Sequence, residues 1–228
     1  MLVKNKIYLS SGGNFDKTKT IDLHFIKSIR ESKKLTILFI PTAKDTDQEG
    51  FKKCFEWLRN KLDLLNARDI IIVMETELSK YIDLEKFGAV YIGGGNTYKL
   101  KKEITESSFN ERLIKYIQSG GIVYGASAGA VIMGKNIAIY QEENKNSYIM
   151  ENGMSLCKDY SIRCHYVKNQ DDEKIWKFIK KYNLPVIALP LGDAILVSDN
   201  KQMLIGEINA FIFNLNRTVM EIEIGHKF

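Results

Sequence analysis

Residues 121–130, Gly-Ile-Val-Tyr-Gly-Ala-Ser-Ala-Gly-Ala, decide the fold and direct attention to Ser127. The apolar run Ile122–Tyr124 is typical of a buried strand, and the small residues after it favour a tight turn into a helix. Within this stretch, Gly125-Ala-Ser-Ala-Gly129 fits the pattern G-x-S-x-G. A serine on such a turn projects its hydroxyl from the carboxyl edge of the sheet. A turn built only for close packing is the alternative, but the flanking strand and helix favour a nucleophile.

A second strand-to-helix turn lies at residues 90–97, Val-Tyr-Ile-Gly-Gly-Gly-Asn-Thr. Three successive glycines free the backbone to direct N–H groups at an anion. No G-K-[ST] follows, and the position that G-x-G-x-x-G reserves for glycine holds Tyr98. Neither nucleotide-binding fingerprint is therefore met.

An oxyanion hole explains this glycine turn better than a phosphate loop. We expect the N–H of Gly95 to converge with that of Ala128, at the N-terminus of the helix after Ser127. Gly94 and Asn96 are then expected to lie beside the substrate. A helix cap supplied by Asn96 or Thr97 is compatible with this hypothesis.

Outward from these turns, short β-branched runs alternate with amphipathic stretches. The expected strands are Ile7–Leu9, Leu35–Ile40, Ile70–Val73 and Ala89–Ile92, and the expected helices are Ile21–Ser32, Phe51–Leu65, Leu100–Ile104 and Phe109–Ile117. Repeated strand–helix–strand units predict a parallel sheet with helices on both faces.

The last third of the chain has shorter strands at closer spacing. They are expected at Ile137–Tyr140, Tyr160–His165, Val186–Leu189, Ala194–Val197, Met203–Ile205, Ala210–Phe213 and Met220–Ile224, with one helix at Lys174–Tyr182. This pattern predicts an antiparallel extension of the same sheet. With three prolines and no visible linker, residues 1–228 are expected to form a single domain.

Composition narrows the function classes. The 228 residues are 45% hydrophobic and 27% charged, and 33 Lys+Arg against 28 Asp+Glu give a net charge of +5. These values exclude long disorder and a disulfide scaffold. The basic residues are dispersed, so we expect no nucleic-acid partner. The three cysteines show no CxxC spacing. The sequence also shows no signal peptide and no apolar run of about eighteen residues, the length that a membrane span needs. We expect a cytoplasmic protein with reduced thiols and with no membrane segment, metal or cofactor.

A serine nucleophile needs a base, and the chain contains three histidines. His24 lies in the first expected helix, His165 ends an expected strand and His226 is near the C-terminus. The end of a strand can face a site at the sheet edge, which favours His165. The neighbouring Cys164 points to the opposite face of an extended strand, so we expect it to fill core.

With these motifs in this order, the chain resembles peptidase E (aspartyl dipeptidase), in the family of serine peptidases that also includes cyanophycinase. The resemblance runs over most of the chain, and it is carried by Gly93–Thr97, the elbow at Ser127, the strand ending in His165, Ala188–Gly192 and the terminal Gly225–Phe228.

The resemblance implies a class I glutamine-amidotransferase-like (flavodoxin-like) fold, a three-layer α/β sandwich with a mostly parallel central sheet. It implies a metal-free Ser–His–acid site that hydrolyses short peptides, typically dipeptides with an acidic first residue. Ser127 matches the nucleophile and His165 the general base, and the N–H groups of Gly95 and Ala128 match the oxyanion hole. Serine in the elbow, where an amidotransferase has cysteine, indicates a peptidase.

The acid of the triad departs from the family pattern. The family's Leu-Pro-x-Gly segment carries a Glu where this chain has Leu191, which cannot orient an imidazole. Asp193, two residues on and on the same face of an extended segment, is the first substitute, followed by Glu142 and Glu143. Losing the orienting acid costs orders of magnitude in turnover, so weak activity stays open.

Substrate specificity is the second departure. The segment between His165 and Leu191 is shorter than the family's, where it holds the basic group that binds an acidic side chain. No specificity residue carries over. Arg163, Lys168 and Lys174 are candidates only by charge and position.

Two alternatives remain open. An α/β-hydrolase-type esterase would use Ser127, Asp193 and His226, in the chain order of that class. A catalytically silent homologue that binds a small acidic ligand or a partner is suggested by Leu191. The sequence gives no indication of the oligomeric state.

Overall fold

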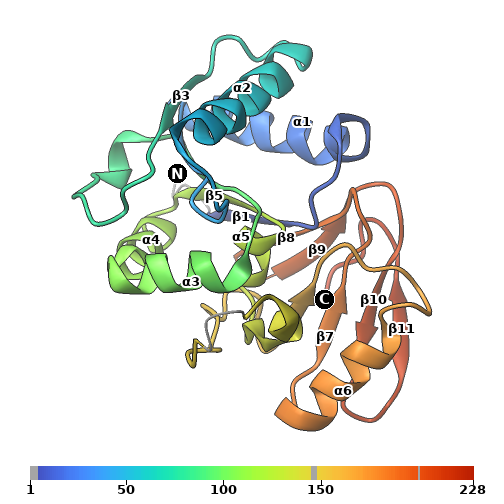
Figure 1. Ribbon diagram of the computed structural model, residues 1–228. Coiled ribbons are helices and arrows are strands. Elements are labelled where there is room, and N and C mark those ends of the chain that lie inside the picture. Colours follow the sequence, from blue (N-terminus) through green and yellow to red (C-terminus); the bar gives the residue numbers. More distant parts are fainter. Residues whose placement is uncertain (1–4, 145–147, 200) are drawn as a thin grey trace.

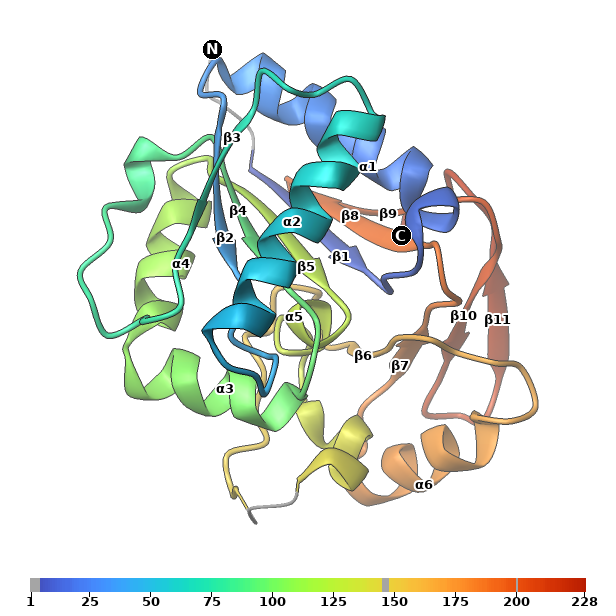
Figure 2. The same cartoon turned by 45° about the horizontal axis from the view of Figure 1, so that its top comes forward.

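The computed structural model describes residues 5–144, 148–199 and 201–228. A central sheet has the strand order β3-β2-β4-β5-β1-β8-β9 (Figures 1 and 2). Its parallel strands are β1 (Lys6–Ser10), β2 (Thr36–Ile40), β3 (Ile71–Met74), β4 (Ala89–Ile92) and β5 (Ile122–Ala126), and its antiparallel strands are β8 (Ala194–Ser198) and β9 (Lys201–Ile205). The protein is therefore a mixed α/β fold with a mostly parallel central sheet, as the sequence predicts.

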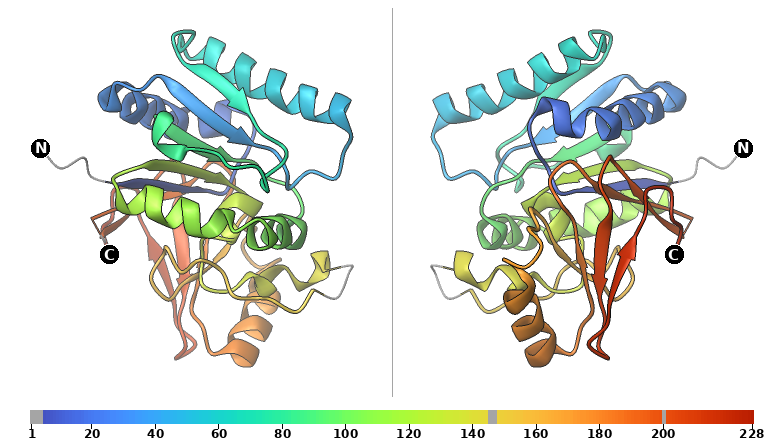
Figure 3. Two further views of the ribbon diagram at one scale, coloured as in Figure 1. Left: turned by 90° about the vertical axis from the view of Figure 1, so that its left-hand side faces the viewer. Right: turned by 90° about the vertical axis from the view of Figure 1, so that its right-hand side faces the viewer.

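Helices cover both faces of this sheet. Helices α1 (Phe15–Ser32) and α2 (Gln48–Leu64) lie on one face, and α3 (Thr97–Glu106) and α4 (Phe109–Gln118) lie on the other (Figure 3). Polar caps begin three of these helices: Asn14, Asp47 and Asn96 each accept a hydrogen bond from a backbone N–H in the first turn. None of the helices in the described residues is both long and apolar enough to cross a bilayer.

A second sheet corrects the prediction for the last third of the chain. Only β8 and β9 extend the central sheet. A separate sheet has the order β11-β10-β7-β6, made of β11 (Val219–Ile222), β10 (Ala210–Phe213), β7 (Val186–Ala188) and β6 (Ser161–Arg163), with α6 (Asp172–Tyr182) beside it. Strands β6 and β7 are parallel because α6 connects them. Strand spacing alone does not say which sheet a strand joins.

The strand predicted at Ile137–Tyr140 is wrong. This segment belongs to a 3₁₀ helix, η2 (Ile137–Glu143), that Asn136 caps. Its four apolar residues are all buried, and a short apolar run fits a buried helical turn as well as a strand. A further 3₁₀ turn, η1 (Leu84–Lys86), precedes β4.

Both sheets share one continuous apolar core. A single cluster joins the second sheet to α3, α4 and the face of the central sheet that these helices cover. It includes Leu9, Val123, Ile187 and Phe213. This is the core that a single domain would have, and the single-domain organisation of residues 1–228 stays a prediction.

A row of aromatic side chains crosses the other face of the central sheet. Phe39, Tyr91, Tyr124 and Tyr8 are paired in register on β2, β4, β5 and β1. The rings of Tyr91 and Tyr124 stack with centroids 4.5 Å apart and planes 9° apart. Aromatic cross-strand pairs stabilise a sheet. This row also forms part of the cavity described below.

Candidate active site

Ser127 lies where β5 ends and the short helix α5 (Ala128–Val131) begins. Its backbone adopts φ 50° and ψ −109°, a region that non-glycine residues avoid. The Ser127 N–H donates to the Ser10 carbonyl at 2.8 Å, which ties the turn to β1. Ser127 occupies the cap position of α5 but its hydroxyl makes no cap hydrogen bond. The hydroxyl is therefore free to react.

The two glycines of the G-x-S-x-G pattern are required by packing. A Cβ on Gly125 would lie 2.6 Å from the carbonyl atoms of Gly129, and a Cβ on Gly129 would lie 2.5 Å from the Ile92 oxygen. Both distances are shorter than real Cβ contacts allow. The glycines thus let α5 return close against β4 and β5 and hold Ser127 in its strained conformation.

The glycine turn after β4 lies against Ser127. A Cβ on Gly94 would be 3.1 Å from the Ser127 Cβ. Gly95 has φ +153°, and a Cβ there would overlap the Ala43 carbonyl, which also accepts the Asn96 N–H at 2.8 Å. Within the described part of the chain, the N–H groups of Gly95 and Ala128 donate to no acceptor. These two unused backbone donors, one in the glycine turn and one at the start of α5, suit an oxyanion.

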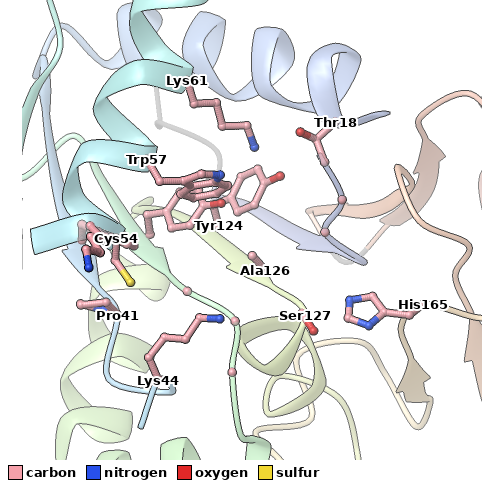
Figure 4. Close-up of a pocket in the computed structure, with 18 of the residues that line it drawn as sticks. Thr18, Pro41, Lys44, Cys54, Trp57, Lys61, Tyr124, Ala126, Ser127 and His165 are labelled. Carbon is pink, nitrogen blue, oxygen red and sulfur yellow. The ribbon is translucent and has the colours of Figure 1, made fainter. Parts of the chain in front are cut away.

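His165 follows β6 and faces Ser127 (Figure 4). A Cβ on Gly12 would lie 3.7 Å from His165 Nε2 and 3.8 Å from the Ser127 Cβ, so the two side chains converge on Gly12. The His165 N–H donates to Ser11 Oγ at 2.7 Å, and that hydroxyl donates to the Leu189 carbonyl at 2.9 Å. This buried serine fixes the main chain of His165, which has φ 56°. The sequence did not single out Ser11.

The protein around the imidazole lowers the pKa of His165 below its ordinary value, because desolvation disfavours the charged form. Arg163 adds to this shift, whereas Asp171 opposes it. A neutral imidazole at neutral pH can accept a proton from a hydroxyl, as a general base must.

Asp193 is buried close to this region, since its carbonyl accepts the Ser11 N–H at 2.8 Å. Its Oδ1 accepts the N–H groups of Glu207 at 3.0 Å and Ile208 at 3.1 Å, and Oδ2 makes no hydrogen bond. Burial raises the pKa of Asp193 to about 6. Among the described residues Asp193 makes neither a hydrogen bond nor an ion pair with His165. Its role as the triad acid stays a prediction.

The other predicted acids also have different partners. Glu142 pairs with Arg163 at 3.2 Å, and Glu143 Oε2 accepts the Thr97 N–H at 2.7 Å. Nowhere in residues 5–144, 148–199 and 201–228 does a carboxylate hydrogen-bond the His165 ring. His226 stacks on Phe228, with centroids 5.9 Å apart, outside the cavity that Ser127 and His165 share.

A cavity of about 580 Å³ opens at Ser127 and His165. Its lysines are Lys44, Lys53 and Lys61, which come from the loop after β2 and from α2. None of the three was among the candidate residues in the sequence. Lys44 could have been found, because it follows β2 and the carboxyl ends of parallel strands meet at the same edge of a sheet.

The basic residues suggested by the sequence lie outside this cavity. Arg163 is buried and pairs with Asp171 at 2.8 Å, Lys174 lies 3.9 Å from Glu142, and Lys168 lies over the ring of Phe211. Gly94 lines the cavity and Asn96 does not, and the contact of either residue with the substrate stays a prediction. Asn96 accepts the Lys99 N–H at 2.8 Å and donates to the Glu143 carbonyl at 3.0 Å, so it serves as a helix cap.

Comparisons with known proteins agree on one family. A model of peptidase family S51 matches residues 7–205. A Listeria monocytogenes relative, named an uncharacterized peptidase, is 30% identical over 155 residues, which cover 64% of this chain and 73% of the relative. A Drosophila melanogaster relative, named "Probable alpha-aspartyl dipeptidase", is 24% identical over 198 residues, which cover 82% of this chain and 79% of the relative. The crystal structure of a peptidase from an acI-B1 Actinobacterium aligns with TM-score 0.73 at 15% identity, covering 100% of this chain and 98% of that one.

Proposed function

The chain belongs to peptidase family S51, and on this premise we propose that it is a serine peptidase that hydrolyses short peptides at Ser127. The resemblance to peptidase E is confirmed by the family match and by the relatives with peptidase names. One observation carries the proposal: Ser127 lies on a strained elbow and faces the His165 imidazole, with the glycine turn against it and the N–H groups of Gly95 and Ala128 unused among the described residues.

The proposed mechanism follows from these positions. Ser127 Oγ attacks the scissile carbonyl carbon while His165 accepts the hydroxyl proton. The N–H groups of Gly95 and Ala128 stabilise the oxyanion of the tetrahedral intermediate. His165 then protonates the leaving amine, and water hydrolyses the acyl-enzyme by the same steps. The helices on both faces of the mostly parallel sheet support a class I glutamine-amidotransferase-like assignment of the fold.

We further propose dipeptides with an acidic first residue as substrates. The name of the Drosophila relative, an alpha-aspartyl dipeptidase, supports this choice. Lys44 also supports it, because this exposed residue lines the cavity and has no ion-pair partner among the described residues. Its ammonium group extends toward the glycine turn beside Ser127 (Figure 4). An unpaired cation at the entrance attracts a substrate carboxylate.

Hydrolysis of Asp-Ala, Glu-Ala, Asn-Ala and Ala-Ala by the wild type, Ser127→Ala, His165→Ala and His226→Ala tests this function. We expect Asp-Ala to be preferred and Ser127→Ala to lower kcat by about 10⁶-fold, the loss typical of a missing serine nucleophile. His165→Ala should have a comparable effect, and His226→Ala should have none. Activity that depends on His226 instead would support the esterase.

A catalytically silent homologue is the second candidate, and it is favoured because no carboxylate in the described residues hydrogen-bonds the imidazole. No turnover by a folded wild-type protein, together with binding of Asp-Ala, would establish that alternative.

A further inference from the structure

The cavity continues from Ser127 beneath α2, away from His165. We call its inner part the aromatic lobe and define it by Phe39, Trp57, Lys61, Tyr91 and Tyr124. Figure 4 shows Trp57, Lys61 and Tyr124 grouped together, on the far side of Ala126 from Ser127. The whole cavity, at about 580 Å³, has a size that holds drug-sized ligands. It is larger than the side chain of an aspartyl residue needs.

The floor of the aromatic lobe is part of the aromatic row on the sheet. The Tyr91 and Tyr124 rings are stacked, and the Phe39 ring meets Tyr91 edge-on with centroids 5.6 Å apart. Strand register fixes these rings on three adjacent strands. The floor is therefore a preformed and almost fully buried aromatic surface, in which Phe39, Tyr91 and Tyr124 are at most 2% exposed.

The wall of the aromatic lobe is Trp57 on α2. This residue is 46% exposed, so part of its ring is accessible to a ligand in the cavity. Lys61, one turn further along α2, holds its ammonium group 5.0 Å from the centre of the Trp57 ring. This cation–π contact helps to hold the indole in place.

The inner end of the aromatic lobe has no net charge. The Lys61 ammonium pairs with the buried Asp22 carboxylate at 2.7 Å. Asp22 also accepts the Thr18 hydroxyl at 2.7 Å and the Tyr124 hydroxyl at 3.2 Å. Because the two charges compensate each other, this end does not require a charged ligand group.

We propose that the aromatic lobe binds one large aromatic side chain of the peptide whose carbonyl Ser127 attacks. This proposal rests on the proposed function and deepens it by naming the substrate class: short peptides with an aromatic residue on one side of the scissile bond. Edge-to-face and offset-stacked contacts with the exposed ring of Trp57 favour an aromatic group over an aliphatic group of similar size. The continuity of the cavity from Ser127 places this side chain in a residue next to the scissile bond.

Two peptide series test the proposal on the full-length protein. The first is Asp-Ala, Asp-Leu, Asp-Phe and Asp-Tyr, and the second is Ala-Ala, Leu-Ala, Phe-Ala and Tyr-Ala. We expect kcat/KM for the aromatic peptides of one series to exceed that of its alanine peptide by at least about tenfold, as filling an apolar pocket does. In Trp57→Ala this ratio should fall toward one. Trp176→Phe, at the chain's other tryptophan, is the matched control and should keep the ratio.

A binding measurement separates failure of this inference from failure of the proposed function. In the double variant Ser127→Ala, Trp176→Phe, Trp57 is the remaining tryptophan, so its fluorescence reports on the aromatic lobe. A saturable response to Asp-Phe or Phe-Ala, but not to Asp-Ala or Ala-Ala, supports the inference even if the wild type hydrolyses nothing. Hydrolysis with no aromatic preference in either series, and no Trp57 response, overturns it and leaves the peptidase assignment intact.

Discussion

The two sides of the candidate site are built in different ways. On the nucleophile side, Ser127 and the Gly93–Gly95 turn are each enclosed by their own strand and helix, and a Cβ on Gly95, Gly125 or Gly129 would collide with backbone. On the base side, His165 follows β6 of the second sheet, and no carboxylate among the described residues hydrogen-bonds its ring. Local packing therefore fixes the proposed nucleophile and the proposed oxyanion donors, whereas the position of the proposed base, His165, depends on distant parts of the chain.

The end of β1 connects these two sides. The Ser10 carbonyl accepts the Ser127 N–H, and the adjacent Ser11 hydroxyl accepts the His165 N–H. One dipeptide thus sets the distance between nucleophile and base. Such positioning matters because an error of about 1 Å at an active site can cost about 10²-fold in rate.

Among variants that keep both Ser127 and His165, the largest effect is expected on the nucleophile side, from Gly95→Ala. A Cβ at φ +153° meets the Ala43 carbonyl, so the turn must move and withdraw one oxyanion donor. We expect kcat to fall by about 10²–10³-fold and the free energy of unfolding by about 1–3 kcal/mol. Steady-state kinetics and chemical denaturation measure both. Gly225→Ala, at a glycine with φ +81° and open space around it, is the matched control and should keep wild-type kinetics.

A smaller effect is expected from Ser11→Ala, which leaves the partly buried His165 N–H without its acceptor. We expect kcat/KM to fall by about 10- to 100-fold and the free energy of unfolding by about 1–3 kcal/mol. The pH profile identifies the positioning role. Desolvation lowers the pKa of His165 below 6.5 in the wild type, so the acidic limb of the kcat/KM profile lies below pH 6.5. In Ser11→Ala the imidazole is held less firmly and is more hydrated, so this limb should move to higher pH.

Ser28→Ala is the matched control for Ser11→Ala. Ser28 is a buried serine on α1, and its hydroxyl forms a 2.7 Å hydrogen bond with the Tyr8 hydroxyl. It should destabilise the protein without moving the pH profile. Ser11→Thr keeps a hydroxyl and should restore the wild-type limb. An unchanged limb in Ser11→Ala would show that Ser11 does not position the base.

The smallest effect on turnover is expected from Asp193→Asn. Asn keeps the Oδ1 acceptor for Glu207 and Ile208, and the wild-type carboxylate makes no contact with the imidazole among the described residues. We therefore expect kcat to change by less than about tenfold, whereas loss of a triad acid costs about 10⁴-fold. A loss of about 10⁴-fold would instead assign Asp193 as the acid that orients His165.

The same variant has a pH-dependent effect on stability. The pKa of Asp193 is raised from 3.8 to about 6, so its protonated form favours the folded state at low pH and this contribution is lost as the pH rises through 6. The shift corresponds to about 3 kcal/mol. Asp193→Asn does not titrate, so its stability relative to the wild type should increase between pH 4 and 7, as thermal unfolding across that range can measure. A constant difference would contradict the shift.

Much of the fold and one side of the site could be predicted from the sequence. Four of the five parallel strands were expected within one residue of their observed bounds, and β5 extends two residues past Tyr124. Buried parallel strands and glycine turns have strong local patterns. The second sheet could not be predicted, because strand partners are chosen by packing between distant segments. The lysines of the cavity were missed for a similar reason, since α2 faces Ser127 only after the sheet forms.

The sequence by itself determined the elbow at Ser127, the glycine turn at Gly95 and the alternation of strands and helices, because these depend on residues within about ten positions of one another and on backbone sterics. Only the tertiary structure decided which histidine faces Ser127, which residues line the cavity and what holds the base. Those choices join residues such as Ser11 and His165, which are 154 positions apart. Their approach depends on the order of strands in two sheets, and strand order results from the packing of the whole chain.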